Sequence, residues 1–370
     1  MIKPRSDYPR EGARKNNRVV LVLFLLSILF ITLIKIIPDT SRSSLRMKMI
    51  KASRIMAEAT ETLNKCRKSK GIPTFKDDVN ETGLVGVEHS IITTSVGRLE
   101  AKRTSTNPNF AALLVFLLNE CGVKEGDVIA VGASGSFPAL IVATLSAAKA
   151  MALNPLVISS LGASQWGANR PDFHWLEMWR CLQAQNIFSV SPLAISIGGE
   201  RDVGEDMDTE GRAHVLEEIR KSRFPLLSEP DLVRNIQSRM DLYRQGANGK
   251  EIKAFVNIGG SWANMGVDSS VLRVKPGLNR ITELPSLETR GMIFAMAAES
   301  IPVVHLLYVR GLAQRYGLPW DPVPLPQPGE GGALRSSQRE ADVICPDWCP
   351  LLDHSSAHHY LLEKTPFLLR

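Results

Sequence analysis

The stretch "DVIAVGASGSFPALIVATL", residues 127–145, passes from a short apolar run through two glycines and two serines into a longer apolar segment. Residues 127–134 have the length and composition of a buried strand, and residues 139–153 those of a helix with dense apolar faces. Glycine and serine between such segments are typical of a tight strand-to-helix turn. The stretch therefore predicts one strand–turn–helix unit of an α/β fold.

The same alternation continues on both sides of this unit. Further strands are expected at 155–164, 192–199, 252–261 and 301–307, and helices at 111–122, 172–185, 211–222, 231–245 and 290–300. Apolar strands that alternate with helices predict a mainly parallel sheet with helices on both faces. Four of the strands end in small-residue turns that begin at Gly132, Gly162, Gly198 and Gly259. Because ligands bind beyond the carboxyl ends of parallel strands, we expect these turns to meet in one crevice.

An N-terminal transmembrane helix is predicted before this α/β fold, over residues 19–37. Residues 19–34 carry no charge, and the segment approaches the ~30 Å hydrocarbon core of a bilayer at ~1.5 Å per residue. A cleaved signal peptide is the alternative, but the apolar run is longer than the usual one and no small-residue cleavage site follows. Basic residues before the segment favour a cytoplasmic N-terminus at 1–18, although others follow it. We therefore expect an uncleaved signal anchor in the cell membrane, a single pass, and an extracytoplasmic globular domain.

The rest of the chain divides into three parts by composition. Residues 38–83 are expected to form a stalk helix and linker, residues 84–329 the α/β globular domain, and residues 330–370 a variable tail without clear periodicity. The apolar content of 44% and charged content of 22% exclude a disordered chain. The net charge of +6 comes without a basic run among aromatics, so no nucleic-acid partner is expected.

Neither a metal site nor a cofactor is predicted. The five cysteines contain no repeated C-x-x-C pair, and they are interpreted as structural or incidental. Cys345 and Cys349 lie close enough for a disulfide or a metal, and three histidines of the tail lie near them, but ligand spacing is lacking. The acidic segment 198–211 lacks the spacing of a calcium loop, which favours a solvated acidic loop.

The turn at 131–140 admits three interpretations. Its sequence G-x-S-x-S departs from a nucleophile elbow only at the last position, so Ser134 or Ser136 is a candidate nucleophile, with His305 as the candidate base. Alternatively, the start of the following helix and the two hydroxyls form a cradle for a phosphate or carboxylate. In the third interpretation, the turn is only a connection.

A second stretch, residues 86–115, brings polar residues to the entry of a helix. Its His89, Lys102 and Arg103 lie among hydroxyl side chains, a combination that suits a carboxylate or phosphate. A polar hairpin whose Thr106 or Asn107 caps the helix is the alternative. The remaining candidate ligand-binding positions lie in the crevice turns and its rim: Gly132, Gly135, Asn169, Gly259 and Gly260.

Five motifs together resemble the poly-gamma-glutamate system protein family. They are "EHSIITTSVGRLEAKRTSTNPNFAALLV", "VGASGSFPAL", "GASQWGAN", "FVNIGG" and "YGLPWDPVPLP", and the resemblance spans about residues 15–330. It implies a membrane-anchored accessory protein encoded with poly-gamma-glutamate synthase, which acts in synthesis or export of the polymer. The implied partners are the synthase subunits, the anionic polymer or a glutamate-like ligand, and the membrane. No catalytic residues are implied by the resemblance.

Three classes of function remain open from the sequence. The first is an accessory protein that binds the anionic polymer, a precursor or the synthase. The second is a serine-dependent hydrolase or transferase that acts on the gamma-glutamyl amide bond through Ser134 or Ser136. The third is a structural subunit with a vestigial crevice. Whether the chain is an enzyme therefore depends on whether a base lies within hydrogen-bond reach of a serine.

Overall fold

The computed structural model describes residues 19–30 and 40–330 of the 370 residues. The chain divides into two units, Met1–Ser44 and Leu45–Arg370. The predicted cytoplasmic segment 1–18 and the tail from residue 331 onward lie outside the described residues.

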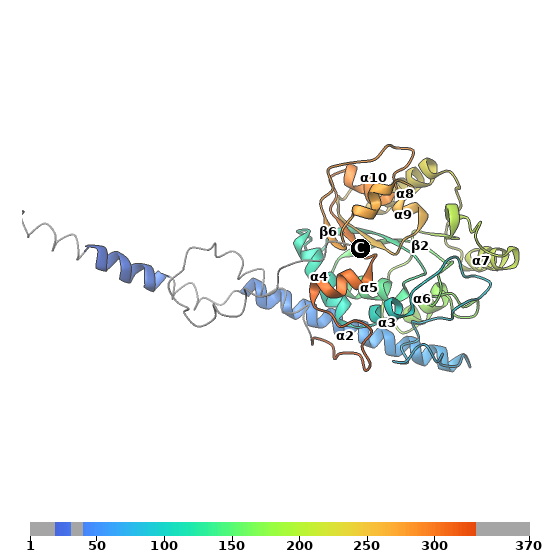
Figure 1. The fold of residues 1–370 in the computed structure, drawn as a ribbon, viewed down its shortest axis with the longest axis horizontal. Helices are drawn as coiled ribbons and strands as arrows, with labels where there is room; N and C mark the ends of the chain where they lie inside the picture. Colours follow the sequence, from blue (N-terminus) through green and yellow to red (C-terminus); the bar gives the residue numbers. More distant parts are fainter. Residues whose placement is uncertain (1–18, 31–39, 331–370) are drawn as a thin grey trace, which may run out of the picture. The chain divides into compact units, whose positions relative to one another are not determined.

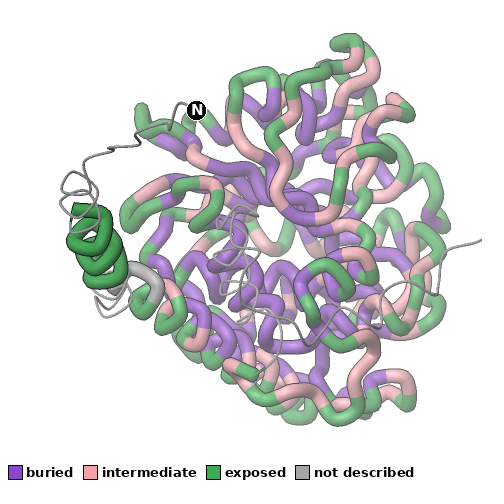
Figure 2. Tube along the Cα trace, turned by 60° about the vertical axis from the view of Figure 1, so that its left-hand side comes forward, coloured by how far each residue is buried: buried purple, intermediate pink, exposed green. Residues whose placement is uncertain are grey.

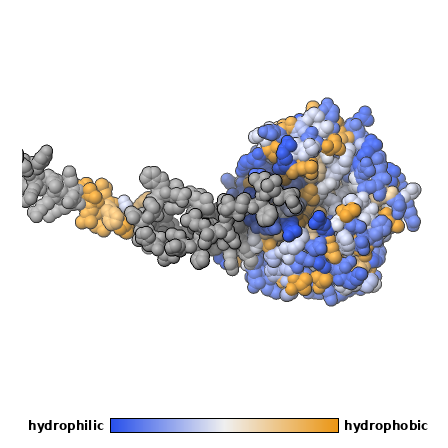
Figure 3. All heavy atoms as spheres, in the orientation of Figure 1, coloured by the Kyte–Doolittle hydropathy of each residue, from blue (hydrophilic) through white to orange (hydrophobic). Residues whose placement is uncertain are grey.

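In the first unit, residues 19–30 form a helix whose side chains are all exposed. They form a continuous apolar surface, drawn green in Figure 2 and orange in Figure 3. Residues 31–37, the remainder of the predicted transmembrane segment, lie outside the described residues. Within the ranges that the structure describes, no helix has both the length and the apolar character needed to cross a membrane.

The second unit is built on a seven-stranded sheet in the order β4-β3-β2-β1-β5-β7-β6. The strands are β1 Val128–Ala133, β2 Asn154–Ser160, β3 Ala194–Ser196, β4 Leu226–Leu227, β5 Ile252–Ile258, β6 Gly277–Asn279 and β7 Val303–His305. All neighbouring strands pair in parallel except β6, which is antiparallel to β7. The predicted mainly parallel sheet is therefore confirmed, and the chain reverses its strand order between β1 and β5.

Helices cover both faces of this sheet (Figure 1). They are α2 Thr40–Ser69, α3 Leu99–Ser105, α4 Asn109–Glu120, α5 Pro138–Met151, α6 Trp175–Ala184, α7 Thr209–Ser222, α8 Leu232–Ala247, α9 Trp262–Met265, α10 Met292–Ala298 and α11 Val309–Tyr316. Side chains of β1 alternate between two cores. Ile129 and Val131 belong to the core with α4 and α5, and Val128 and Ala130 to the core with α8 and α10. Burial on both faces explains why β1 is apolar throughout.

Most of the segment predicted as a stalk helix and linker, residues 38–83, forms helix α2. From Leu45 onward it belongs to the second unit, which therefore begins well before the predicted boundary at residue 84. Its Met49, Met56 and Leu63 are fully buried in the core that contains α4 and α5. The periodic apolar residues of this segment form one face of a helix, and packing that face removes it from water.

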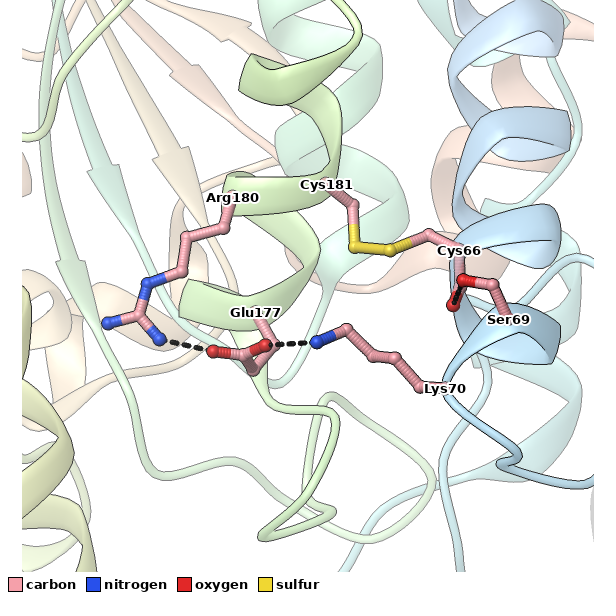
Figure 4. The surroundings of a disulfide bond; sticks show 6 residues. All are labelled: Cys66, Ser69, Lys70, Glu177, Arg180 and Cys181. Carbon is pink, nitrogen blue, oxygen red and sulfur yellow. Dashed lines mark hydrogen bonds and ion pairs between the residues drawn. A yellow bond between two sulfur atoms is a disulfide. The ribbon is translucent and has the colours of Figure 1, made fainter.

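A disulfide joins Cys66 of α2 to Cys181 of α6, which are 115 positions apart in the chain (Figure 4). Beside it, Lys70 Nζ lies 2.8 Å from a carboxylate oxygen of Glu177, whose other oxygen accepts from Arg180. The covalent link and the ion pair thus hold α2 against α6. The sequence analysis named neither cysteine as a partner, and Cys345 and Cys349 lie outside the described residues.

We expect removal of the disulfide to destabilise the second unit. Cys66→Ser or Cys181→Ser should lower the free energy of unfolding by about 2–4 kcal/mol, because the unfolded chain loses a crosslink that closes a long loop. Urea unfolding followed by circular dichroism measures this loss, and a reductant should bring the wild-type protein to the same midpoint. Cys121→Ser, which removes a free and half-buried thiol, is the matched control. An unchanged midpoint in both disulfide variants would contradict the expectation.

Candidate functional site

A cavity of about 810 Å³ lies at the carboxyl edge of the sheet. Residues that follow five different strands contribute to its wall: Ser134 and Ser136 after β1, Ser164 after β2, Gly199 after β3, Gly260 and Ser261 after β5, and Tyr308 after β7. Helix α3 and the segment before it close the opposite side through Thr94, Arg98 and Lys102. The cavity thus occupies the crevice expected at the point where the strand order reverses.

Lys102 is the one cation among the described lining residues that is buried, with 3% of its surface exposed. Its Nζ donates to the carbonyl oxygen of Ser136 and to Ser164 Oγ, at 2.8 Å for the latter, and lies 3.7 Å from the ring centroid of Phe137. None of the described residues places a carboxylate against it. Burial without a counter-charge disfavours the ammonium form and lowers the pKa of Lys102 to about 7.

Ser134 and Ser136 brace the turn between β1 and α5. Ser134 Oγ donates to Ser136 Oγ at 2.9 Å and accepts from the Ser136 amide at 3.2 Å, and Ser136 Oγ accepts from the Ser164 amide at 2.9 Å. The Gly135 and Phe137 amides donate to the carbonyls of Ser160 and Ser134. These amides are therefore bonded within the protein, as are those of Leu140 and Ile141 at the start of α5, which donate to the Phe137 carbonyl oxygen.

The mouth of the cavity carries an excess of positive charge. Arg98 and Arg310 are exposed there, and the Arg310 guanidinium lies 5.6 Å from the ring centroid of Trp320. Asp206 is the carboxylate among the described lining residues, and its Oδ1 accepts from the Glu200 amide at 2.9 Å. Anionic ligands are therefore favoured at this mouth.

Seven predicted site residues do not line this cavity: His89, Arg103, Gly132, Gly135, Asn169, Gly259 and His305. Arg103 pairs with both carboxylate oxygens of Asp321, at 2.7 Å from its Nε, on the other side of α3. Asn169 is fully buried, and its amide oxygen and nitrogen bond to the backbone of Val87. His89 borders a separate hollow with Phe75 and Asp77.

His305 lies at the end of β7, where its Nδ1 is 2.9 Å from Asn257 Nδ2. Burial lowers the pKa of His305 to about 4. The structure therefore does not place this histidine as the base for Ser134 or Ser136, because the side chain is held by its neighbour on β5 and stays out of the cavity wall. The pairing of β5 with β7 determines this position, since Asn257 and His305 are direct register partners.

The glycines that were predicted as ligand-binding positions mainly allow close packing. A Cβ on Gly132 would lie 2.7 Å from the Asn264 side chain, and one on Gly135 would lie 2.9 Å from the Leu161 carbonyl oxygen. Gly259 has a φ of +82° beside Ser134, a conformation that favours glycine. Only Gly260 among these four contributes to the cavity wall.

Sequence reasoning missed several lining residues. Ser164 and Arg98 lie within quoted motifs but were not singled out as site residues, and Arg310 lies in no motif. Tyr308 is also new: it is 62% exposed at the mouth and has a φ of +62°, which is unusual for a residue with a side chain. A small-residue turn after each parallel strand was the available signal for Ser164, because it places the following side chain at the crevice.

A second cluster lies away from the cavity, on α6 and α7. His174, Glu177 and Glu218 bring one possible metal-ligand atom each to within 4.8 Å of one another. Both carboxylates already have cationic partners, Lys70 and Arg180 for Glu177 and Lys221 for Glu218. These ion pairs account for the cluster as a contact between helices.

Only part of the acidic loop that was predicted to be solvated is exposed. Asp202 is buried and pairs with Arg239 at 2.5 Å, while its other oxygen accepts from Ser196 Oγ. Glu205, Asp206 and Asp208 are exposed.

We expect Lys102 to make stability depend on pH in a defined direction. Its pKa is about 7 in the folded protein and 10.5 in a free side chain, so the unfolded chain binds more protons between these values and the stability contributed by this group rises with pH. Lys102→Met removes this dependence. The variant should therefore exceed the wild type in unfolding free energy by the most at pH 6, and the gap should narrow towards pH 10.

Urea unfolding at pH 6, 8 and 9.5 tests this expectation. Lys124→Met, which replaces an exposed lysine, is the matched control and should give a small, constant difference. If the difference in unfolding free energy between Lys102→Met and the wild type stays constant over this pH range, Lys102 does not titrate as described.

Comparison with protein-family models, with curated proteins and with solved structures found no match to this chain.

Proposed function

We propose that this chain is a membrane-anchored accessory protein of poly-gamma-glutamate synthesis or export, and that its cavity binds glutamyl carboxylates of the polymer or of a precursor. The motifs that resemble the poly-gamma-glutamate system family fall on the parts that build the cavity. They include α3 with Lys102, the turn after β1 and the turn after β2. The synthase subunits remain the partners that this resemblance implies.

The excess of cationic side chains around the cavity is the observation that carries the proposal. Arg98 and Arg310 line the cavity, whereas Asp206 is the single carboxylate among the described lining residues and is already engaged by a backbone amide. Arginine offers paired N–H donors that match a carboxylate. Arg310 is also positioned by the Trp320 ring, so less conformational freedom is lost when it binds.

The interior suits the uncharged parts of such a ligand. Hydroxyls of Ser134, Ser136, Ser160, Ser164 and Ser261 line it, and each can donate to or accept from an amide. The volume of about 810 Å³ falls in the roughly 300–1,000 Å³ range of ligand cavities. A gamma-glutamyl chain, which alternates amides with carboxylates, satisfies both the hydroxyl interior and the cationic mouth.

An extracytoplasmic position of the second unit forms part of the proposal. The Cys66–Cys181 disulfide supports it, because such bonds persist in oxidising compartments and are rare in the cytosol. The exposed apolar helix at residues 19–30 supports attachment to a membrane through the predicted segment 19–37.

Membrane attachment is tested by extraction of cell membranes with alkaline carbonate. We expect the full chain to stay in the pellet and its mature N-terminus to lie before Val19. Replacing Leu23 and Leu26 by Arg, which puts two charges into the apolar helix, should release the protein into the soluble fraction. A mature N-terminus near Asp39 would show a cleaved signal peptide instead.

Ligand binding is tested with gamma-glutamyl oligomers of defined length. Replacing both Arg98 and Arg310 by Ala should weaken binding about tenfold, which corresponds to ~1.4 kcal/mol, because the mouth loses two carboxylate partners. The difference between variant and wild type should shrink at high salt, since exposed charges are screened. Isothermal titration calorimetry at two salt concentrations measures both effects.

Arg234→Ala is the matched control, because Arg234 is an exposed arginine on α8 that does not line the cavity. It should bind oligomers as the wild type does. If the double variant binds as tightly as this control, the cationic mouth does not recognise the oligomer and the proposal fails.

A further inference from the structure

Lys102 and Ser164 are in contact and are of the residue types that serve as a general base and a nucleophile. Lys102 Nζ lies 2.8 Å from Ser164 Oγ, within the ~2.6–3.2 Å required of a general base. Both side chains are part of the cavity wall. The two residues come from α3 and from the turn after β2, which are 62 positions apart in the chain.

Burial of Lys102 favours the neutral amine that a base must be. The residue is 3% exposed and has no carboxylate beside it among the described residues. A neutral amine has two N–H groups and one lone pair. The ammonium form donates to both the Ser136 carbonyl and Ser164 Oγ. In the neutral amine one N–H keeps the bond to the carbonyl, and across the same 2.8 Å contact the lone pair can accept the proton of Ser164.

Ser164 is held in place by its own backbone. Its amide donates to Ser136 Oγ at 2.9 Å, and its carbonyl accepts from the Gly167 amide at 2.9 Å. By contrast, the hydroxyls of Ser134 and Ser136 bond to each other and to backbone amides. Among the serines of the cavity wall, Ser164 is therefore the one whose hydroxyl is bonded to the buried amine in the described structure.

We propose that Ser164 and Lys102 form a serine–lysine dyad that cleaves gamma-glutamyl amide bonds in this cavity. Ser164 Oγ attacks the amide carbonyl carbon, and its proton passes to Lys102 Nζ. The C–N bond then breaks as Lys102 returns that proton to the leaving nitrogen, which leaves an ester on Ser164. Water cleaves the ester, with Lys102 carrying its proton to Ser164 Oγ, and a free carboxylic acid departs.

The choice of substrate rests on the proposed function, whereas the dyad itself rests on the contacts of Lys102 and Ser164. The test therefore separates the two. The purified full-length protein in detergent is treated with an alkyl fluorophosphonate, which reports a nucleophilic serine, and in parallel titrated with gamma-glutamyl oligomers. Oligomer binding without fluorophosphonate labelling overturns the dyad and leaves the proposed function. Labelling without oligomer binding overturns the proposed function and leaves the dyad.

Labelling of the wild type should map to Ser164 by mass spectrometry. Ser164→Ala should abolish it, and Lys102→Met should slow it ~100-fold, the lower range for loss of a general base. The wild-type rate should rise with pH to a midpoint near 7, where Lys102 loses its proton, and this midpoint should be absent in Lys102→Met. A label on Ser134 or Ser136, or an unlabelled wild type, overturns the proposal.

Two further variants distinguish loss of the nucleophile from loss of folding. Ser159→Ala removes another buried hydroxyl of β2 that does not line the cavity, and it should be labelled as the wild type is. Ser164→Cys keeps a side chain of similar size, and a folded protein with this change should be alkylated by iodoacetamide at position 164. A folded Ser164→Cys protein that resists alkylation shows that the position is closed to substrate and overturns the proposal. Shortening of the oligomers by wild type, lost in Ser164→Ala, is the expected outcome with substrate.

Discussion

The central strand β1 is the constraint on which the second unit depends. It pairs in parallel with β2 on one edge and with β5 on the other, and all six of its residues are buried. Parallel pairing obliges the chain to return over the faces of the sheet, which is why helices cover both sides. It also brings the carboxyl ends of the strands to one edge. The turns of β1, β2 and β5 meet there because of this geometry, whatever their sequences.

The buried lysine lowers the stability that the rest of the fold provides. Placing an amine with 3% exposure beside a phenyl ring and two serines costs stability whenever it is protonated. Apolar packing in the two cores around β1 offsets such a cost. A buried titratable side chain in a cavity wall is typical of a binding or catalytic site.

The sequence predicted the sheet well because its information is local. Apolar runs of strand length that end in glycine identify β1, β2, β3 and β5 without knowledge of their partners. The side of a helix on which a residue points, and the residue it meets there, are not local. Lys102 and Arg103 are adjacent on α3, but successive residues of a helix point about 100° apart, so only Lys102 reaches the cavity. Arg103 meets Asp321, 218 positions away, which no pattern near it indicates.

The same reason explains the other differences. His305 seemed available as a base because it ends a strand, yet its neighbour in the sheet, Asn257, holds it. The apolar face of α2 was visible in the sequence, but its burial against α4 and α5 depends on the tertiary fold. The Cys66–Cys181 pair required α2 and α6 to be neighbours, which their spacing in the sequence does not show.

That disulfide also bears on the maturation of the chain. Cys181 follows β1 and β2 in the sequence but precedes β5 and β7, so both thiols exist before the second half of the sheet has been made. Cys121 lies between them and is a wrong partner available at that time. Once the chain is folded, burial raises the pKa of Cys121 to about 12 and withdraws it from exchange. Formation of the native bond requires α2 and α6 to lie side by side, so the bond fixes covalently a contact that the chain makes across β1 and β2.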